Sequence, residues 1–254
     1  MDRKWIVKRL KNVKLNKPIM IEGLPGIGNV GKISIDFIIE SLKAQKIYEI
    51  YSDSFPNFVL VNEKGVIELP KVEVYHKKIK GQDFFLVSGD VQPVDEKSSY
   101  DFCERLLELF EKTSGREIVT LGGMGLEDIP KIPKVYCSGT DRKLIEKFKA
   151  SGIKSAEGIV GPIVGVSGLL VGLCKTRGMS GTVLLVETLA VPHYLGIKES
   201  RELLKILNEH YKLGLNMNNL NKEISIIEKD IREKLEKFVA VEKKRGKQEI
   251  SYIG

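Results

Sequence analysis

Cysteine, histidine and aromatic residues are all scarce in this 254-residue chain. The three cysteines (Cys103, Cys137 and Cys174) are odd in number and widely spaced, which argues against a disulfide framework and against a cysteine metal cluster. The three histidines are dispersed as well, and none stands in the His-x-x-x-His spacing of a metal site. We therefore expect no metal and a reducing, cytoplasmic location.

Long hydrophobic runs are also missing. The longest candidate, residues 158–174, contains five glycines together with Pro162 and Ser167, which indicates buried α/β backbone rather than a membrane span. Basic residues interrupt any apolar segment near the N-terminus, so a signal peptide is not indicated. We expect no membrane partner.

The net charge of +7 is concentrated at the N-terminus, where residues 1–17 hold seven basic residues and one acidic residue. These charges alternate with Trp5, Ile6, Val7 and Leu10, a pattern typical of a half-buried edge element with solvated charges. A phosphate-binding arm is the alternative, but a nucleic-acid protein usually spreads its basic residues over a supported face. The chain is therefore not expected to bind nucleic acid.

Strands and helices alternate along most of the chain. Two hairpins, over 58–69 and 72–88, interrupt this alternation and predict a mixed-sheet α/β/α sandwich rather than a purely parallel sheet. The remaining predicted strands are 18–22, 46–51, 117–121, one ending at Cys137, and 183–186; the predicted helices are 33–43, 97–113, 141–150 and 199–212.

The C-terminal part has a different pattern. From Leu220 to Val241, seven apolar residues recur every three or four positions among charged residues, which predicts an amphipathic helix about 40 Å long. Gly246 ends this pattern, and a short mobile tail follows. We expect an α/β core over 1–215, a helix over 216–245 and a flexible tail over 246–254.

A glycine-rich segment follows the first predicted strand and precedes a helix. Gly26, Gly28 and Gly31 satisfy G-x-G-x-x-G, and Asp53 lies where a ribose-binding acid would be expected. Lys32 follows, but a P-loop needs a hydroxyl residue directly after its lysine, and Ile33 occupies that position. The segment is either a phosphate-binding loop or a tight turn that lets a helix pack closely on a strand.

Few residues indicate catalysis. Ser167 and Ser180 lie in G-x-S-G segments that lack the second glycine of a nucleophile elbow. His193 is the one histidine in a plausible loop site, and no base, nucleophile or metal set assembles around it. This pattern favours a binding protein over an enzyme.

Three motifs together resemble the PAC2 family: residues 21–32, residues 121–125, and residues 161–172 leading to 184–188. The resemblance covers about residues 18–215. It implies a fold similar to purine nucleoside phosphorylases without their active-site residues, a homo-oligomer of four or five subunits, and an ATP-independent role in proteasome assembly or activation. On this interpretation the chain needs no cofactor, and Gly26, Gly28, Gly31 and Lys32 form a structural loop.

The resemblance also points to the C-terminus. Proteasome-binding partners of this kind commonly end in hydrophobic-Tyr-X, and this chain ends in Tyr252, Ile253 and Gly254, with the tyrosine third from the end. We expect these three residues to contact proteasome α subunits or the α-ring. Two alternatives stay open: an enzyme acting on a nucleotide or nucleoside through Gly26–Lys32, and a module that binds another protein through the 219–245 stripe.

Overall fold

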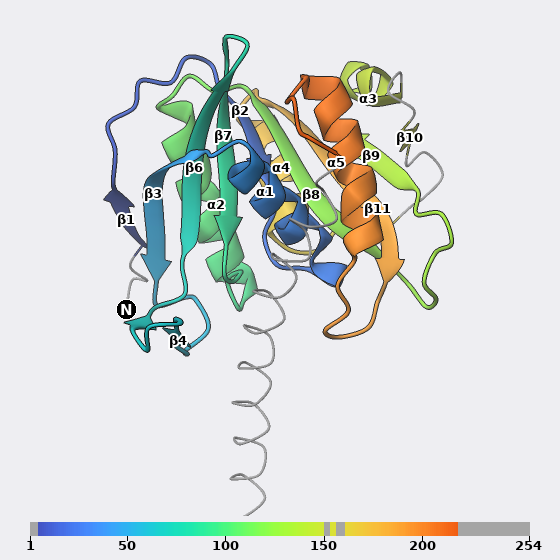
Figure 1. Cartoon of the computed structure of the whole chain (residues 1–254). Coiled ribbons are helices and arrows are strands. Elements are labelled where there is room, and N and C mark those ends of the chain that lie inside the picture. Colours follow the sequence, from blue (N-terminus) through green and yellow to red (C-terminus); the bar gives the residue numbers. More distant parts are fainter. Residues whose placement is uncertain (1–4, 150–152, 156–160, 218–254) are drawn as a thin grey trace, which may run out of the picture.

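The computed structural model describes residues 5–149, 153–155 and 161–217. One nine-stranded sheet organises them (Figure 1). Its strands run in the order β1 (Trp5–Arg9), β3 (Gln45–Ser52), β6 (Val72–Ile79), β7 (Gln82–Gly89), β2 (Ile19–Glu22), β8 (Glu117–Leu126), β11 (Ser180–Leu189), β9 (Val135–Gly139) and β10 (Lys154–Ser155). A separate hairpin joins β4 (Leu60–Val61) to β5 (Ile67–Glu68).

The sheet is mixed, as the two hairpins predicted. The central strands β7, β2, β8 and β11 are parallel, whereas β1 pairs antiparallel with β3, β6 with both β3 and β7, and β9 with β11. The central strands carry runs of consecutive apolar residues, which fits the burial of both of their faces. Met20 and Ile21 illustrate this, since these neighbours in β2 belong to two different apolar clusters.

Helices cover both faces of the sheet. A short 3-10 turn, η1 (Ile27–Asn29), leads into α1 (Val30–Ser41), which packs with α5 (Ile197–Tyr211), while α2 (Glu96–Glu111) packs with α4 (Val166–Thr176) on the other face (Figure 1). The fifth helix, α3 (Arg142–Lys149), lies against β9. Each helix buries an apolar stripe, and in α2 this stripe includes Phe102, Leu106 and Phe110.

The predicted N-terminal edge element is confirmed. β1 forms one edge of the sheet, and its Trp5 ring packs against Phe55 and Phe102 with ring centroids 5.6 and 5.5 Å away. Lys8 on the same strand keeps most of its side chain exposed. The strand therefore anchors one face in the core and leaves its charges in solvent.

Two expectations need correction, and a third stays untested. Residues 158–174 are not simply buried backbone, because residues 166–176 form α4 and the side chain of Val164 is 87 % exposed. The strand predicted to end at Leu121 continues through the following glycines to Leu126, because its pairing with β11 extends that far. The helix and tail predicted beyond residue 217 lie outside the described residues, so the division at 215 and 245 stays a prediction.

Candidate functional site

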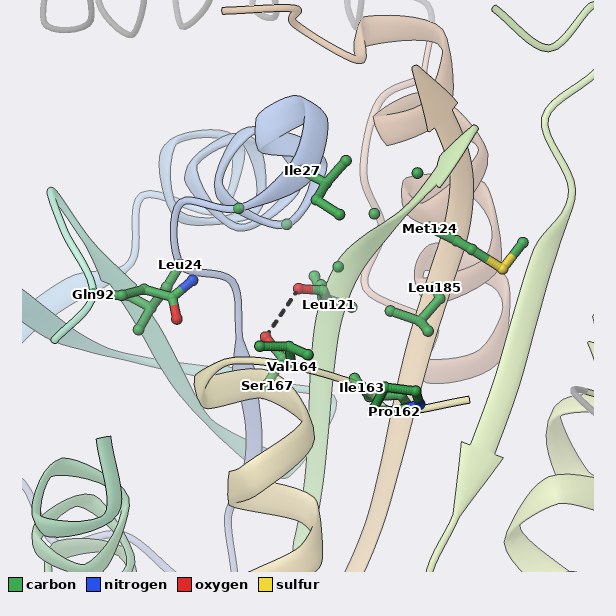
Figure 2. A pocket seen from close by; sticks show the side chains of 15 residues that line it. Leu24, Ile27, Gln92, Leu121, Met124, Pro162, Ile163, Val164, Ser167 and Leu185 are labelled. Carbon is green, nitrogen blue, oxygen red and sulfur yellow. Dashed lines mark hydrogen bonds between the residues drawn. The ribbon is translucent and has the colours of Figure 1, made fainter. Parts of the chain in front are cut away.

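A cavity of about 400 Å³ lies where the parallel strands β2 and β8 end (Figure 2). Ligands of open α/β sheets bind in the crevice outside the carboxyl ends of the strands, between the diverging helix layers. Six segments contribute its walls: the glycine-rich turn with the residues before it, the loop after β7, the second half of β8, the loop before α4, the first turn of α4, and β11. The lining residues are Leu24, Gly26, Ile27, Gly31, Gln92, Leu121, Gly122, Gly123, Met124, Gly125, Pro162, Ile163, Val164, Ser167 and Leu185.

A buried carboxyl supports one wall of this cavity. The hydroxyl of Ser167 donates to Oε2 of Glu22 at 3.0 Å, and the backbone N–H of Leu24 donates to Oε1 at 3.1 Å. Complete burial raises the pKa of the Glu22 carboxyl to about 7, and the two hydrogen bonds lower it in part. Ser167 Oγ also lies 3.5 Å from the carbonyl oxygen of Leu121 (Figure 2).

Gln92 connects the two sides of the cavity. Its Nε2 donates to the carbonyl oxygen of Pro25, and its Oε1 accepts from the backbone N–H of Val166 at 3.2 Å. The second bond satisfies one of the free N–H groups at the start of α4. The amide thereby fixes the loop after β2 relative to the first turn of α4.

Lys32 does not have the environment of a phosphate-binding lysine. Its ammonium donates to Asp36 Oδ2 at 2.5 Å and to Ser88 Oγ at 3.2 Å, with only 10 % of the side chain exposed. Ser88 in turn donates to Asp36 at 2.5 Å. The cation is thus neutralised inside the protein by its neighbour one helical turn away.

The glycine-rich turn packs against the sheet without side chains in between. Gly28 has φ +62°, a left-handed conformation that favours glycine, and a Cβ there would meet Thr188 of β11. A Cβ at Gly31 would overlap the carbonyl oxygen of Leu121 in β8. These contacts support the interpretation of the segment as a close-packing turn.

Asp53 is not brought to this turn. Asp53 directly follows β3, and β3 is separated from β2 by β6 and β7, whereas a dinucleotide fold would place the two strands side by side. Asp53 instead lines a second, larger cavity of about 780 Å³ with Tyr51, Phe55 and Leu69. The expected ribose-binding arrangement is therefore absent from the described part of the chain.

The other singled-out residues are dispersed. Ser180 begins β11 at the end of the sheet opposite Ser167. His193 lies exposed in the loop after β11, with φ +67°. His210 stacks on Phe148 with ring centroids 4.1 Å apart, and its burial lowers its pKa. Within the described ranges no group of three potential metal ligands occurs, and no helix is long and apolar enough to span a membrane.

Most exposed large apolar side chains gather at this same end of the molecule. They lie in η1, in the segment between β3 and β6, and in the loops after β7, β8 and β11 and before α4. The members are Ile27, Val59, Val61, Val66, Ile67, Leu69, Val94, Ile129, Ile132, Val164 and Val191. We call this set the apolar end; such clustering marks interaction surfaces more often than scattered exposure does.

Glu22 and Gln92 were missed as site residues from sequence. The sequence did contain a signal for Glu22, which directly follows the apolar run Ile19–Ile21. A carboxylate at the end of a buried strand rarely lacks a partner, so its position indicated a buried polar contact. The tail residues Tyr252, Ile253 and Gly254 lie outside the described residues, so their role stays a prediction.

Comparison with known proteins identifies relatives over nearly the whole chain. The PAC2 family model matches residues 20–235. Pyrococcus furiosus PbaB, described as an archaeal proteasome activator, is 33% identical with a TM-score of 0.80, covering 90% of this chain and 98% of that one. Pyrococcus furiosus PbaA, described as a homolog of proteasome-assembly chaperone, shares the fold at 22% identity and a TM-score of 0.76, covering 95% and 100%. An uncharacterized protein of Methanocaldococcus jannaschii is 29% identical over 99% of this chain and 98% of its own length.

Proposed function

The chain belongs to the PAC2 family, and from this premise we propose that it is a homo-oligomeric, ATP-independent protein that assists proteasome assembly or activates the proteasome. Its C-terminal region makes the contact with α subunits or the α-ring. The observation that carries the proposal is the 33% identity to an archaeal proteasome activator, which extends over nearly the full length of both chains.

The environment of the glycine-rich turn supports a role that needs no nucleotide. A P-loop lysine has to reach phosphate oxygens, whereas the ammonium of Lys32 is engaged by Asp36 and Ser88. The turn itself is filled by close contacts with β8 and β11. Both features agree with a family whose named relatives are an assembly chaperone homolog and an activator.

The proposed oligomer has two sources of apolar surface. One is the apolar end, and the other is the stripe predicted from Leu220 to Val241. Identical subunits that bury such surfaces favour closed point-group symmetry. Several C-termini on one side of such an oligomer would face a symmetric ring together and raise a weak contact by avidity, by roughly 10²-fold.

Deleting residues 252–254, or replacing Tyr252 with alanine, should abolish binding to a purified α-ring. A terminal carboxylate and a nearby tyrosine ring provide one charged and one aromatic anchor. Tyr252→Ala removes the ring, and the deletion removes the ring and shifts the terminal carboxylate to Ser251. Surface plasmon resonance at two salt concentrations measures the effect, and light scattering checks that the oligomer mass is unchanged. Tyr100→Ala removes a half-exposed tyrosine from α2 and is the matched control. Unchanged binding after the deletion would move the contact to the α/β core.

Calorimetry with ATP, GTP and NAD should detect no binding at micromolar concentrations. Lys32→Ala should also leave α-ring binding intact, although loss of the contact with Asp36 will reduce stability. Lys97→Ala on the exposed side of α2 is the control for removing one positive charge. Micromolar nucleotide affinity that disappears in Lys32→Ala would instead support an enzyme acting on a nucleotide or nucleoside.

A further inference from the structure

We propose that the cavity at the ends of β2 and β8 binds a small, neutral, planar heteroaromatic molecule whose N–H group donates a hydrogen bond to Ser167. The proposal is independent of the proteasome, because it concerns the cavity in the core and not the C-terminal region. It rests on the cavity's size, walls and polar groups. A volume of about 400 Å³ lies in the ordinary range for small-molecule sites.

The walls of the cavity favour a ligand with a largely apolar surface. Aliphatic side chains of Ile27, Ile163, Val164 and Leu185 face the cavity together with Met124 (Figure 2). Along β8 the lining residues include Gly122, Gly123 and Gly125, so part of this wall is bare backbone without side chains. A flat peptide surface opposite aliphatic side chains fits a planar ring better than a branched or globular molecule.

The absence of a free positive charge among the described lining residues argues against an anionic ligand. Among the described residues that line the cavity, none is a lysine or an arginine. The nearby ammonium of Lys32 is held by Asp36 and Ser88. A phosphate or carboxylate in this cavity would be desolvated beside a buried carboxyl without a compensating cation, which is strongly unfavourable.

The polar groups set the hydrogen-bond pattern. Above about pH 7, where Glu22 is ionised, the single hydroxyl proton of Ser167 is used by the bond to Oε2 of Glu22, so the remaining lone pairs of Oγ accept from a ligand. Gln92 uses one of its two amide protons on Pro25 and one Oε1 lone pair on Val166, and these bonds hold its side chain in place. The complementary ligand therefore carries a donor near Ser167 and apolar surface against the aliphatic walls.

Indole is the probe, because it is neutral, planar and carries one N–H donor, and 1-methylindole lacks that donor. At pH 8, where Glu22 is ionised, ligand-observed NMR should show saturable indole binding in the sub-millimolar to millimolar range, and about fivefold weaker binding of 1-methylindole. Ser167→Ala should weaken indole by a similar factor and leave 1-methylindole unchanged, which separates loss of the hydrogen bond from a change of shape. Ser180→Ala at the opposite end of the sheet is the matched control.

Gly26→Leu should block both ligands, because Gly26 lines the cavity and has an extended backbone that accepts a side chain. Should this variant fail to fold, Val164→Trp at the highly exposed rim provides the second block. No saturable binding of indole at 5 millimolar, roughly the weak end expected for so small a ligand, would overturn the proposal. Binding that survives a folded blocking variant would overturn it too, as would equal losses of both ligands in Ser167→Ala.

Discussion

Replacing Gly31 with alanine should destabilise the protein by roughly 3 kcal/mol or more, which is a large fraction of the stability of an ordinary domain. A Cβ at this position would overlap the carbonyl oxygen of Leu121. That oxygen belongs to a residue of β8 that pairs with Leu184 of β11 and directly follows the last pair with β2, so neither α1 nor β8 can move aside at low cost. Chemical denaturation followed by circular dichroism measures the change.

Gly172→Ala is the matched control for Gly31→Ala. Gly172 also lies within a helix, but a Cβ there would meet no atom within 4 Å, and the position is exposed. Alanine has the higher helix propensity, so this change should stabilise by up to about 1 kcal/mol. A Gly31→Ala variant as stable as the native chain would show that the contact between α1 and β8 is not tight.

Glu22→Gln should make the protein more stable than the native chain at alkaline pH but not at acidic pH. The native carboxyl has a pKa of about 7 in the folded state and its ordinary value of 4.5 when unfolded. Between these pH values the folded state keeps a proton that the unfolded state has released, so the native chain loses stability as pH rises. At 1.36 kcal/mol per pKa unit, the loss between pH 4.5 and pH 8 is about 3 kcal/mol.

Glutamine is neutral at every pH and keeps the shape of the protonated acid. The groups that face Glu22 do not ionise in this range, since Ser167 and the Leu24 N–H are neutral and burial raises the pKa of the Cys103 thiol. Denaturation curves of both proteins at pH 4.5 and pH 8 give the difference between their free energies of unfolding at each pH. Groups that titrate equally in both proteins do not contribute to this difference. A constant difference across this pH range would show that Glu22 is already ionised at low pH.

Glu68→Gln is a control of opposite sign. The hydrogen bond from Lys71, 2.9 Å long, lowers the pKa of the exposed Glu68 carboxyl. A lowered pKa contributes stability that is present above the unfolded value of 4.5 and is lost as pH falls below it. Denaturation curves extended below pH 4.5 should therefore show this variant becoming less stable relative to the native chain as pH rises towards 4.5, with little further change above it.

Local sequence patterns predicted much of the fold. The hairpin of β6 and β7 followed from two β-rich runs around a Gly-containing turn, and the two interruptions of alternation predicted a mixed sheet. Which strands become neighbours could not be predicted locally. Asp53 was therefore placed beside the glycine-rich turn, although two strands separate β3 from β2.

Helix α4 was not predicted from the sequence because of its glycines. Gly168 and Gly172 lower the helix propensity of residues 166–176, but burial of Val166, Leu170 and Cys174 outweighs that local cost. The Glu22–Ser167 contact could not be predicted either, because it joins positions 145 residues apart, and only the topology brings them together.

The order of the strands also affects how the protein is made. β2 is near the N-terminus but lies mid-sheet, and α1 packs against α5, whose Leu203, Leu204 and Leu207 join the same apolar cluster. During synthesis the apolar face of α1 therefore stays partly uncovered until residues 197–211 have left the ribosome and α5 can pack against it. At about 5–20 residues per second, that interval lasts roughly 10 to 30 s. Throughout this interval the nascent chain exposes an apolar face of α1 that the finished protein buries against α5, so contacts of this face with chaperones or with other nascent chains are possible only during synthesis.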